Sequence, residues 1–230
     1  EKNRRLLDLA GVKQGDRVLE IGCGWGGFAL QAAHERSAQV TGVTVSRAQY
    51  DEACRRVQAA GLCELVDILL CDYRDLEGKW DHAVSIEMIE AVGEKYWDTY
   101  FKRVSDSVKP GGTFALQAIV IENERFDAYR RSADFIQKHI FPGGALLSPA
   151  VMRDRAAAAG FGWKSEHGYG LDYAETLARW RNRFEAAADR VSEMGFDERF
   201  RRCWSFYLAY CEGGFRAGNI DALQVALVRR

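Results

Sequence analysis

Short apolar runs alternate with amphipathic segments through the first half of the chain. Each run is bounded by glycine or polar residues, as is typical of strands buried on both faces of a parallel sheet. Between the runs, apolar residues recur at the spacing of a helix with one buried face. The pattern predicts strands at 18–21, 40–45, 66–70, 82–86 and 113–121, and helices at 3–10, 26–35, 47–60 and 96–108.

This alternation predicts an α/β fold: a doubly wound, mostly parallel, Rossmann-like sheet with helices on both faces. Ligands of such sheets bind beyond the carboxyl ends of the strands, where the strand order reverses. We therefore expect the ends of the first four strands to converge on one crevice. Those ends lie at Gly22, Thr44, Asp72 and Ile86.

The second half of the chain is richer in helix. Helices are expected at 123–138, 149–159, 173–194 and 197–217, and strands at 163–169 and 223–228. We expect residues 1–230 to form a single domain, with helical insertions after the fifth and sixth strands at about 122–147 and 172–218. The late helices carry aromatic residues at helical spacing. These suit a cover over an apolar acceptor site, but for most of them an ordinary core is the favoured interpretation.

A glycine-rich turn follows the first strand and predicts a nucleotide-like cofactor. Gly22, Gly24 and Gly27 fit the dinucleotide pattern, but an NAD site needs an acid near the end of the second strand, where this chain has 44–46, Thr-Val-Ser. The acid is Glu20, before the glycines, which favours S-adenosylmethionine (SAM). Asp72 and Tyr73 offer an acceptor and a ring face to adenine. The expected cofactor-binding residues are Glu20, Gly22, Gly24, Gly26, Thr44, Ser46, Gln49, Asp72, Tyr73 and Ile86.

Composition narrows the class of partner. The net charge is −1, so no bulk basic field indicates nucleic acid. The six cysteines form no C-x-x-C pair and indicate reduced thiols in a cytoplasmic protein. No histidine spacing predicts a metal site, and no apolar run reaches the roughly 20 residues of a membrane span. The chain begins at Glu1 rather than Met, so we expect a further segment before it.

Several stretches together carry a family resemblance. They are the loop at 20–27, Gly42–Ser46 followed by Gln49, Asp72–Asp75, Phe141–Gly144 and Asp172–Trp180. Over nearly its whole length the chain resembles the cyclopropane-fatty-acid synthases and mycolic acid methyltransferases, which are class I SAM-dependent methyltransferases. The resemblance implies methyl transfer from SAM to the double bond of an unsaturated acyl chain in a phospholipid, through a carbocation. A bound bicarbonate then takes a proton, and a cyclopropane closes.

The resemblance also implies the catalytic residues. Glu90 matches the glutamate near the bicarbonate and the cation, Tyr207 the tyrosine of the late helix, and Ile119 the isoleucine whose backbone lines the site. At Gln117 the family has histidine. Glutamine can donate to an anion but cannot act as an acid or a base, so bicarbonate binding and ring closure both remain open. Proton loss from a neighbouring carbon would instead give a methylene or methyl-branched chain.

Two alternatives keep the cofactor. One is N-methylation of a small amine, which needs no bicarbonate, and the other is a SAM-binding module without catalysis. For the lipid enzyme we expect peripheral contact with the inner face of the membrane through Arg130, Arg131 and the region of Phe135. The sequence leaves the oligomeric state open.

Overall fold

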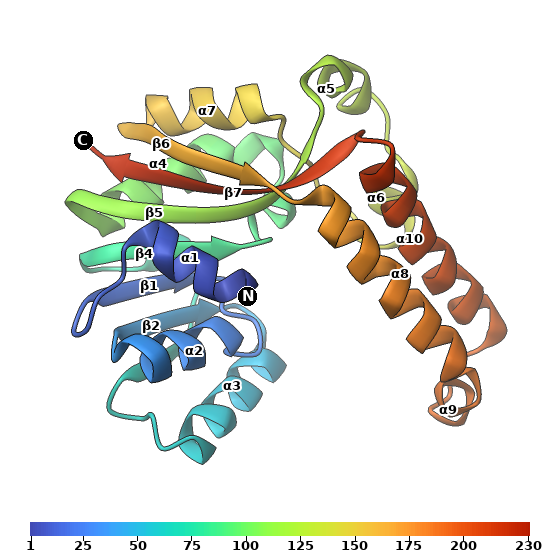
Figure 1. Ribbon diagram of the computed structural model, residues 1–230, viewed down its shortest axis with the longest axis horizontal. Helices are drawn as coiled ribbons and strands as arrows, with labels where there is room; N and C mark the ends of the chain where they lie inside the picture. Colours follow the sequence, from blue (N-terminus) through green and yellow to red (C-terminus); the bar gives the residue numbers. More distant parts are fainter.

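The computed structural model describes residues 1–230 and contains one seven-stranded sheet in the order β3-β2-β1-β4-β5-β7-β6 (Figure 1). Neighbouring strands are parallel except around β7, which is antiparallel to both β5 and β6. The predicted doubly wound, mostly parallel α/β fold is confirmed. The strands are β1 Arg17–Ile21, β2 Gln39–Thr44, β3 Val66–Leu70, β4 Trp80–Ile86, β5 Val108–Ile121, β6 Phe161–Gly168 and β7 Ile220–Arg229.

Helices cover both faces of the sheet because successive strand residues point to opposite sides. Val18 and Val84 pack with the side that holds α1 Lys2–Ala10, α2 Gly27–Arg36 and α3 Arg47–Ala59. Their neighbours Leu19 and Ala83 pack with the side that holds α4 Trp97–Ser107 and α7 Pro149–Ala158. The two apolar layers explain why the strands appear in the sequence as continuous apolar runs.

Two expected helices are divided. The segment predicted as a helix over 123–138 forms α5 Asn123–Tyr129 and α6 Phe135–His139. Asp134 begins α6 with a capping box, because its carboxylate accepts from the Gln137 N–H while the Gln137 side chain accepts from the Asp134 N–H. The helix expected over 173–194 forms α8 Gly170–Ala186 and α9 Ala188–Glu193. The expected helix over 197–217 is confirmed as α10 Glu198–Arg216.

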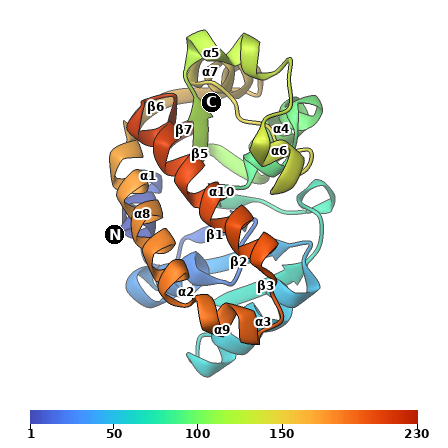
Figure 2. The ribbon, with the colours of Figure 1, turned by 90° about the vertical axis from the view of Figure 1, so that its right-hand side faces the viewer.

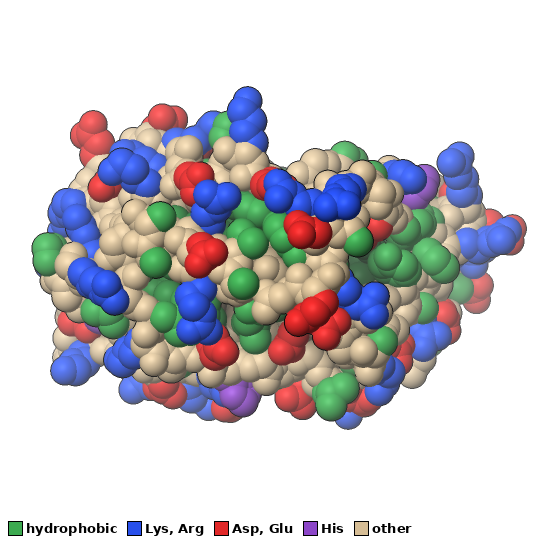
Figure 3. All heavy atoms as spheres, turned by 90° about the horizontal axis from the view of Figure 1, so that it is seen from above, with side chains coloured by type: hydrophobic (Ala, Val, Ile, Leu, Met, Phe, Trp, Pro, Cys, Tyr) green, Lys and Arg blue, Asp and Glu red, His purple; other side chains and the backbone are tan.

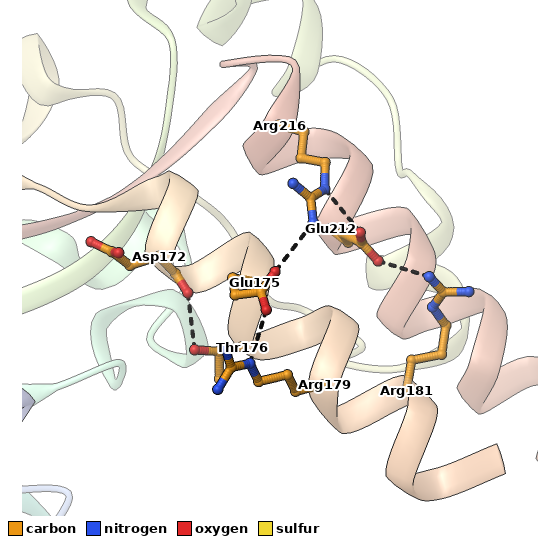
Figure 4. Close-up of polar contacts among 7 residues, drawn as sticks. All are labelled: Asp172, Glu175, Thr176, Arg179, Arg181, Glu212 and Arg216. Carbon is orange, nitrogen blue, oxygen red and sulfur yellow. Dashed lines mark hydrogen bonds and ion pairs between the residues drawn. The ribbon is translucent and has the colours of Figure 1, made fainter. Parts of the chain in front are cut away.

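The helices α8 and α10 pack side by side and project beyond the end of the sheet (Figures 1 and 2). Their apolar contacts include Leu177, Leu208 and Phe215. A polar seam runs along the same pair: Arg181 donates to Glu212 at 3.0 Å, and Arg216 donates to Glu212 at 2.9 Å (Figure 4). Glu212 is largely covered, but Arg181 and Arg216 remain partly open to solvent. Ion pairs that solvent can screen contribute little each, so the apolar contacts supply most of the packing energy. None of the helices has the length and apolar character that a membrane crossing requires.

Candidate active site

The glycine loop at the end of β1 needs its glycines for two reasons. Gly22, Gly24 and Gly26 have φ angles of 77°, 52° and 79°, in the left-handed region that side chains disfavour. Space is also short, since a Cβ at Gly22 would lie 2.8 Å from the Met88 Cγ, and one at Gly26 would lie 3.2 Å from the Ala53 Cβ. The loop therefore lies directly against the segment that follows β4.

Glu20 lies beneath this loop, inside the sheet, with only 2% of its surface exposed. Burial raises the pKa of its carboxyl well above the usual value, and the Ala29 N–H in the first turn of α2 partly offsets that shift. One of its oxygens has no hydrogen-bond partner within the protein. This position suits holding the loop and the start of α2 in place.

The predicted residues after β2 form one hydrogen-bonded group. The Thr44 hydroxyl donates to Gln49 Oε1 at 2.9 Å and accepts from the Ser46 N–H at 3.1 Å. Ser46 in turn begins α3, since its side chain accepts from the Gln49 N–H at 3.4 Å. The structure therefore brings these three residues together beside the glycine loop.

The next strand ends supply the remaining predicted cofactor residues. The Asp72 carboxylate accepts from the Arg74 guanidinium at 2.6 and 2.9 Å, which lowers the pKa of Asp72. The Tyr73 ring packs edge-on against Tyr100, with 5.5 Å between ring centroids. Ile86 ends β4 and pairs with Gln117. Because β1 to β4 are parallel neighbours, their carboxyl ends lie at the same end of the sheet.

Glu90 lies in a short 3-10 turn after β4. One of its carboxylate oxygens accepts from the Ile119 N–H at 2.5 Å, and the other is buried without a partner. Burial raises the pKa of Glu90 to about 7; the Ile119 N–H opposes that rise, and the charge of Glu87 adds to it. A carboxyl in this condition can exchange a proton near neutral pH.

A second carboxylate, Glu87, was missed by sequence reasoning. Its Oε1 accepts from the Gln117 side-chain amide at 2.5 Å, and its Oε2 accepts from the Tyr173 hydroxyl at 2.7 Å. Lys2 lies 3.8 Å from the same carboxylate. The backbone φ of Glu87 is 51°, a strained value of the kind that clusters at functional sites. Its place directly after Ile86, three residues before Glu90, was a signal that could have revealed it.

Three tyrosines lie near Glu87, and one of them, Tyr173, donates to its carboxylate. Burial is the main cause that raises the pKa of Tyr207 to about 12 and also raises the pKa values of Tyr169 and Tyr173, with the charge of Glu87 contributing to all three. The Tyr207 ring lies 6.1 Å from that of Phe141 and 5.1 Å from that of Trp204. The Tyr169 hydroxyl is buried without a partner.

This arrangement joins carboxylates and aromatic rings among partly buried side chains next to the glycine loop. Aromatic faces and carboxylates both stabilise a positive charge. Because Glu90 has a free oxygen and a raised pKa, it can also accept a proton. The site therefore suits a reaction in which a cation forms and then loses a proton.

Comparisons with known proteins identify the family. Residues 1–225 match the family model of mycolic acid cyclopropane synthetase. The chain is 47% identical to a tuberculostearic acid methyltransferase of Mycobacterium tuberculosis, over 98% of this chain and 53% of that protein. It is 38% identical to the cyclopropane-fatty-acyl-phospholipid synthase of Escherichia coli, over 99% of this chain and 57% of that protein. The chain thus spans little more than half the length of these relatives.

A solved structure agrees with the sequence matches. The fold superposes on that of a mycolic acid cyclopropane synthase complexed with SAH and CTAB, with a TM-score of 0.92 at 26% identity. The match covers 99% of this chain and 83% of that one. The resemblance to class I methyltransferases is thereby confirmed for the fold, and the chain belongs to the mycolic acid cyclopropane synthetase family.

Proposed function

We propose that the chain is a SAM-dependent methyltransferase that acts on the double bond of an unsaturated acyl chain in a phospholipid. The glycine loop, the Thr44 group, Asp72 and Tyr73 would hold SAM, and the SAH complex of the related synthase supports this choice of cofactor. The relatives named for fatty-acyl substrates support the acceptor. The observation that carries the proposal is the pair of carboxylates, Glu87 and Glu90, in the segment that lies against the glycine loop, with three tyrosines near Glu87.

The chemistry follows from the site. The π electrons of the olefin attack the methyl carbon of SAM, the carbon–sulfur bond breaks, and a carbocation remains on the acyl chain. An olefin is a poor nucleophile, so the protein contributes positioning and fixed negative charge. Glu87 is held in place by Tyr173 and Gln117 and supplies charge, while Glu90 takes the proton on its free oxygen.

We propose a methylene-branched product rather than a cyclopropane. Gln117 stands where cyclopropane synthases of the family carry histidine, and its amide is already bonded to Glu87. The identity to a relative named as a methyltransferase, 47%, exceeds the 38% to one named as a cyclopropane synthase. Both points favour a route in which the hydrogen on the methylated carbon shifts, with its electron pair, to the cationic carbon. The positive charge then lies beside the new methyl group, and loss of a methyl proton to Glu90 forms the exocyclic double bond.

Bicarbonate is not required by this proposal. An added anion would lie beside two carboxylates, Glu87 and Glu90, and like charges this close repel. Methyl transfer should therefore proceed at an unchanged rate in buffer freed of carbon dioxide. A large rise in rate on adding bicarbonate would contradict this part of the proposal.

The test uses SAM labelled in its methyl group, with vesicles of a monounsaturated phospholipid. Label is expected in the lipid extract, and none with a saturated phospholipid of the same headgroup. The tyrosines and carboxylates would also suit an ammonium group, so small-molecule amine methylation is the second candidate. Label in a small amine, with none in the lipid, would favour it over the lipid function.

The acceptor would reach the site from a membrane surface along α6 and α10. Phe206 and Tyr210 are 52% and 43% exposed and flank Phe135, whose ring lies 4.6 Å from that of Phe206. Figure 3 shows hydrophobic side chains gathered in a hollow on the side where α5, α6 and α10 lie. Of the expected basic contacts, Arg130 pairs with Glu94, and Arg131 is exposed.

Vesicle co-sedimentation tests the proposed membrane contact. Phe206→Asp should lower the fraction of protein bound to vesicles several-fold, because it places a charge on the surface of α6 and α10 that we propose inserts into the lipid. Ala59→Asp on α3 adds the same charge at an exposed position elsewhere and should leave binding unchanged. Equal binding by both variants would contradict the assignment of this face.

A further inference from the structure

Two buried glutamines face each other across the antiparallel pair of β5 and β7. Gln117 and Gln224 are directly opposite in register, and both are fully buried. Opposed residues of an antiparallel pair lie on the same face of the sheet and can bond to each other. Burying an amide without a partner costs free energy, so a directly opposed pair of buried glutamines suggests a specific role.

The hydrogen bonds give each amide a direction. The Gln224 Nε2 donates to Gln117 Oε1 at 3.0 Å and to the Lys2 carbonyl at 3.1 Å. Because the Gln117 oxygen accepts from Gln224, its NH2 group faces Glu87 and donates to the carboxylate. A reversed Gln117 would oppose its NH2 to that of Gln224 and its oxygen to the Glu87 carboxylate, which are both repulsive contacts.

The first turn of α1 completes the chain of contacts. The Lys2 carbonyl accepts from the Gln224 amide, and the ammonium group of Lys2 lies 3.8 Å from the Glu87 carboxylate. Lys2 of α1 and Gln117 of β5 thus both contact the Glu87 carboxylate, and Gln224 of β7 is bonded to each of them.

We propose that Gln224 is a positioning residue for the reaction, which aims the Gln117 amide at Glu87 and so fixes the carboxylate against Tyr173. This inference rests on the proposed function. A charge that is fixed before the reaction stabilises a forming cation without reorganising, whereas a loose carboxylate must first be oriented. Gln224 itself need not touch the substrate.

A double-mutant cycle with Gln224→Met and Gln117→Met tests the proposal. A hydrogen bond to a charged group is worth enough to change a rate by about tenfold or more. We expect Gln224→Met to lower kcat about tenfold while KM for the lipid changes little. We expect it to lower kcat no further in the Gln117→Met background, because Gln224 acts through Gln117. The exposed Gln58→Met on α3 is the matched control and should behave as the wild type.

The double variant limits a folding defect, since replacing both glutamines by apolar side chains of similar shape leaves no buried side-chain amide unpaired. The Lys2 carbonyl and the Glu87 carboxylate each lose one donor. If Gln224→Met lowers kcat equally in both backgrounds, or leaves the wild-type kcat unchanged, the positioning role is wrong. If the wild type itself transfers no label to lipid, the proposed function fails first. The two failures are therefore distinguishable in one set of assays.

Discussion

Replacing Glu90 by glutamine should stabilise the protein above neutral pH while it impairs the reaction. The pKa of Glu90 rises from 4.5 to about 7 on folding, mainly through burial. A carboxyl with a raised folded pKa binds more protons in the folded state, so its contribution to stability is greatest below 4.5 and falls as the pH rises through 7. The difference of about 2.5 units corresponds to a cost of about 3 kcal/mol above pH 7.

Glutamine keeps an oxygen for the Ile119 N–H and carries no charge, so it avoids that cost. Urea unfolding at pH 5 and pH 8 measures the effect: Glu90→Gln should exceed the wild type by about 3 kcal/mol at pH 8 and by much less at pH 5. The rate of methyl transfer should fall on the order of a hundredfold, because the proton acceptor is lost.

The control is Glu64→Gln, an exposed glutamate before β3, which should change neither the rate nor the pH profile of stability. A Glu90→Gln variant no more stable than the wild type at pH 8 would refute the reasoning about burial. Full activity in that variant would refute the role of Glu90 as proton acceptor.

Three further predictions concern the glycine loop, Thr44 and the helix pair α8 and α10. Gly22→Ala should lower the free energy of unfolding by about 1–3 kcal/mol, because it adds a clash with Met88 to the backbone strain. The same change should abolish SAM binding as measured by calorimetry. The control Gly15→Ala, also at positive φ but in open space, should bind SAM normally. Thr44→Val should raise the Kd for SAM about three- to tenfold by removing two hydrogen bonds, and an unchanged Kd would exclude Thr44 from the site. Arg181→Met should lower the stability measured by thermal unfolding by at most about 1 kcal/mol, because Glu212 still pairs with Arg216. A larger loss would show that the polar seam contributes substantially to the packing of α8 against α10.

The strands β1 to β4 could be predicted because both faces of this part of the sheet are buried, which requires the continuous apolar runs that the sequence shows. The start of β5 could not: it begins at Val108 rather than at 113, since Val108 pairs with Trp80 across an irregularity in register. The break between α8 and α9 falls at Ala187, where no glycine or proline marks it. Sequence periodicity alone does not reveal such a break.

The site was predictable where a short motif specifies it and not where distant segments meet. Thr44, Ser46 and Gln49 lie in the short stretch 44–49, which the sequence predicts to contribute to cofactor binding, and the structure joins them by hydrogen bonds. The bonds of Gln224 to Gln117 and to Lys2 join positions 107 and 222 residues apart, and only the register of β5 with β7 reveals them. Glu87 could have been suspected, but its bond to Tyr173 depends on how α8 folds over the sheet.

The central claim is that the carboxylates of this chain guide a carbocation on an acyl chain to a methylene product. The most direct measurement is carbon NMR of lipid extracted after reaction of monounsaturated phospholipid vesicles with SAM carrying ¹³C in its methyl group. The expected result is label in an exocyclic methylene carbon. Label in a cyclopropane ring carbon, or lipid that remains unlabelled while SAM is bound, would contradict the claim.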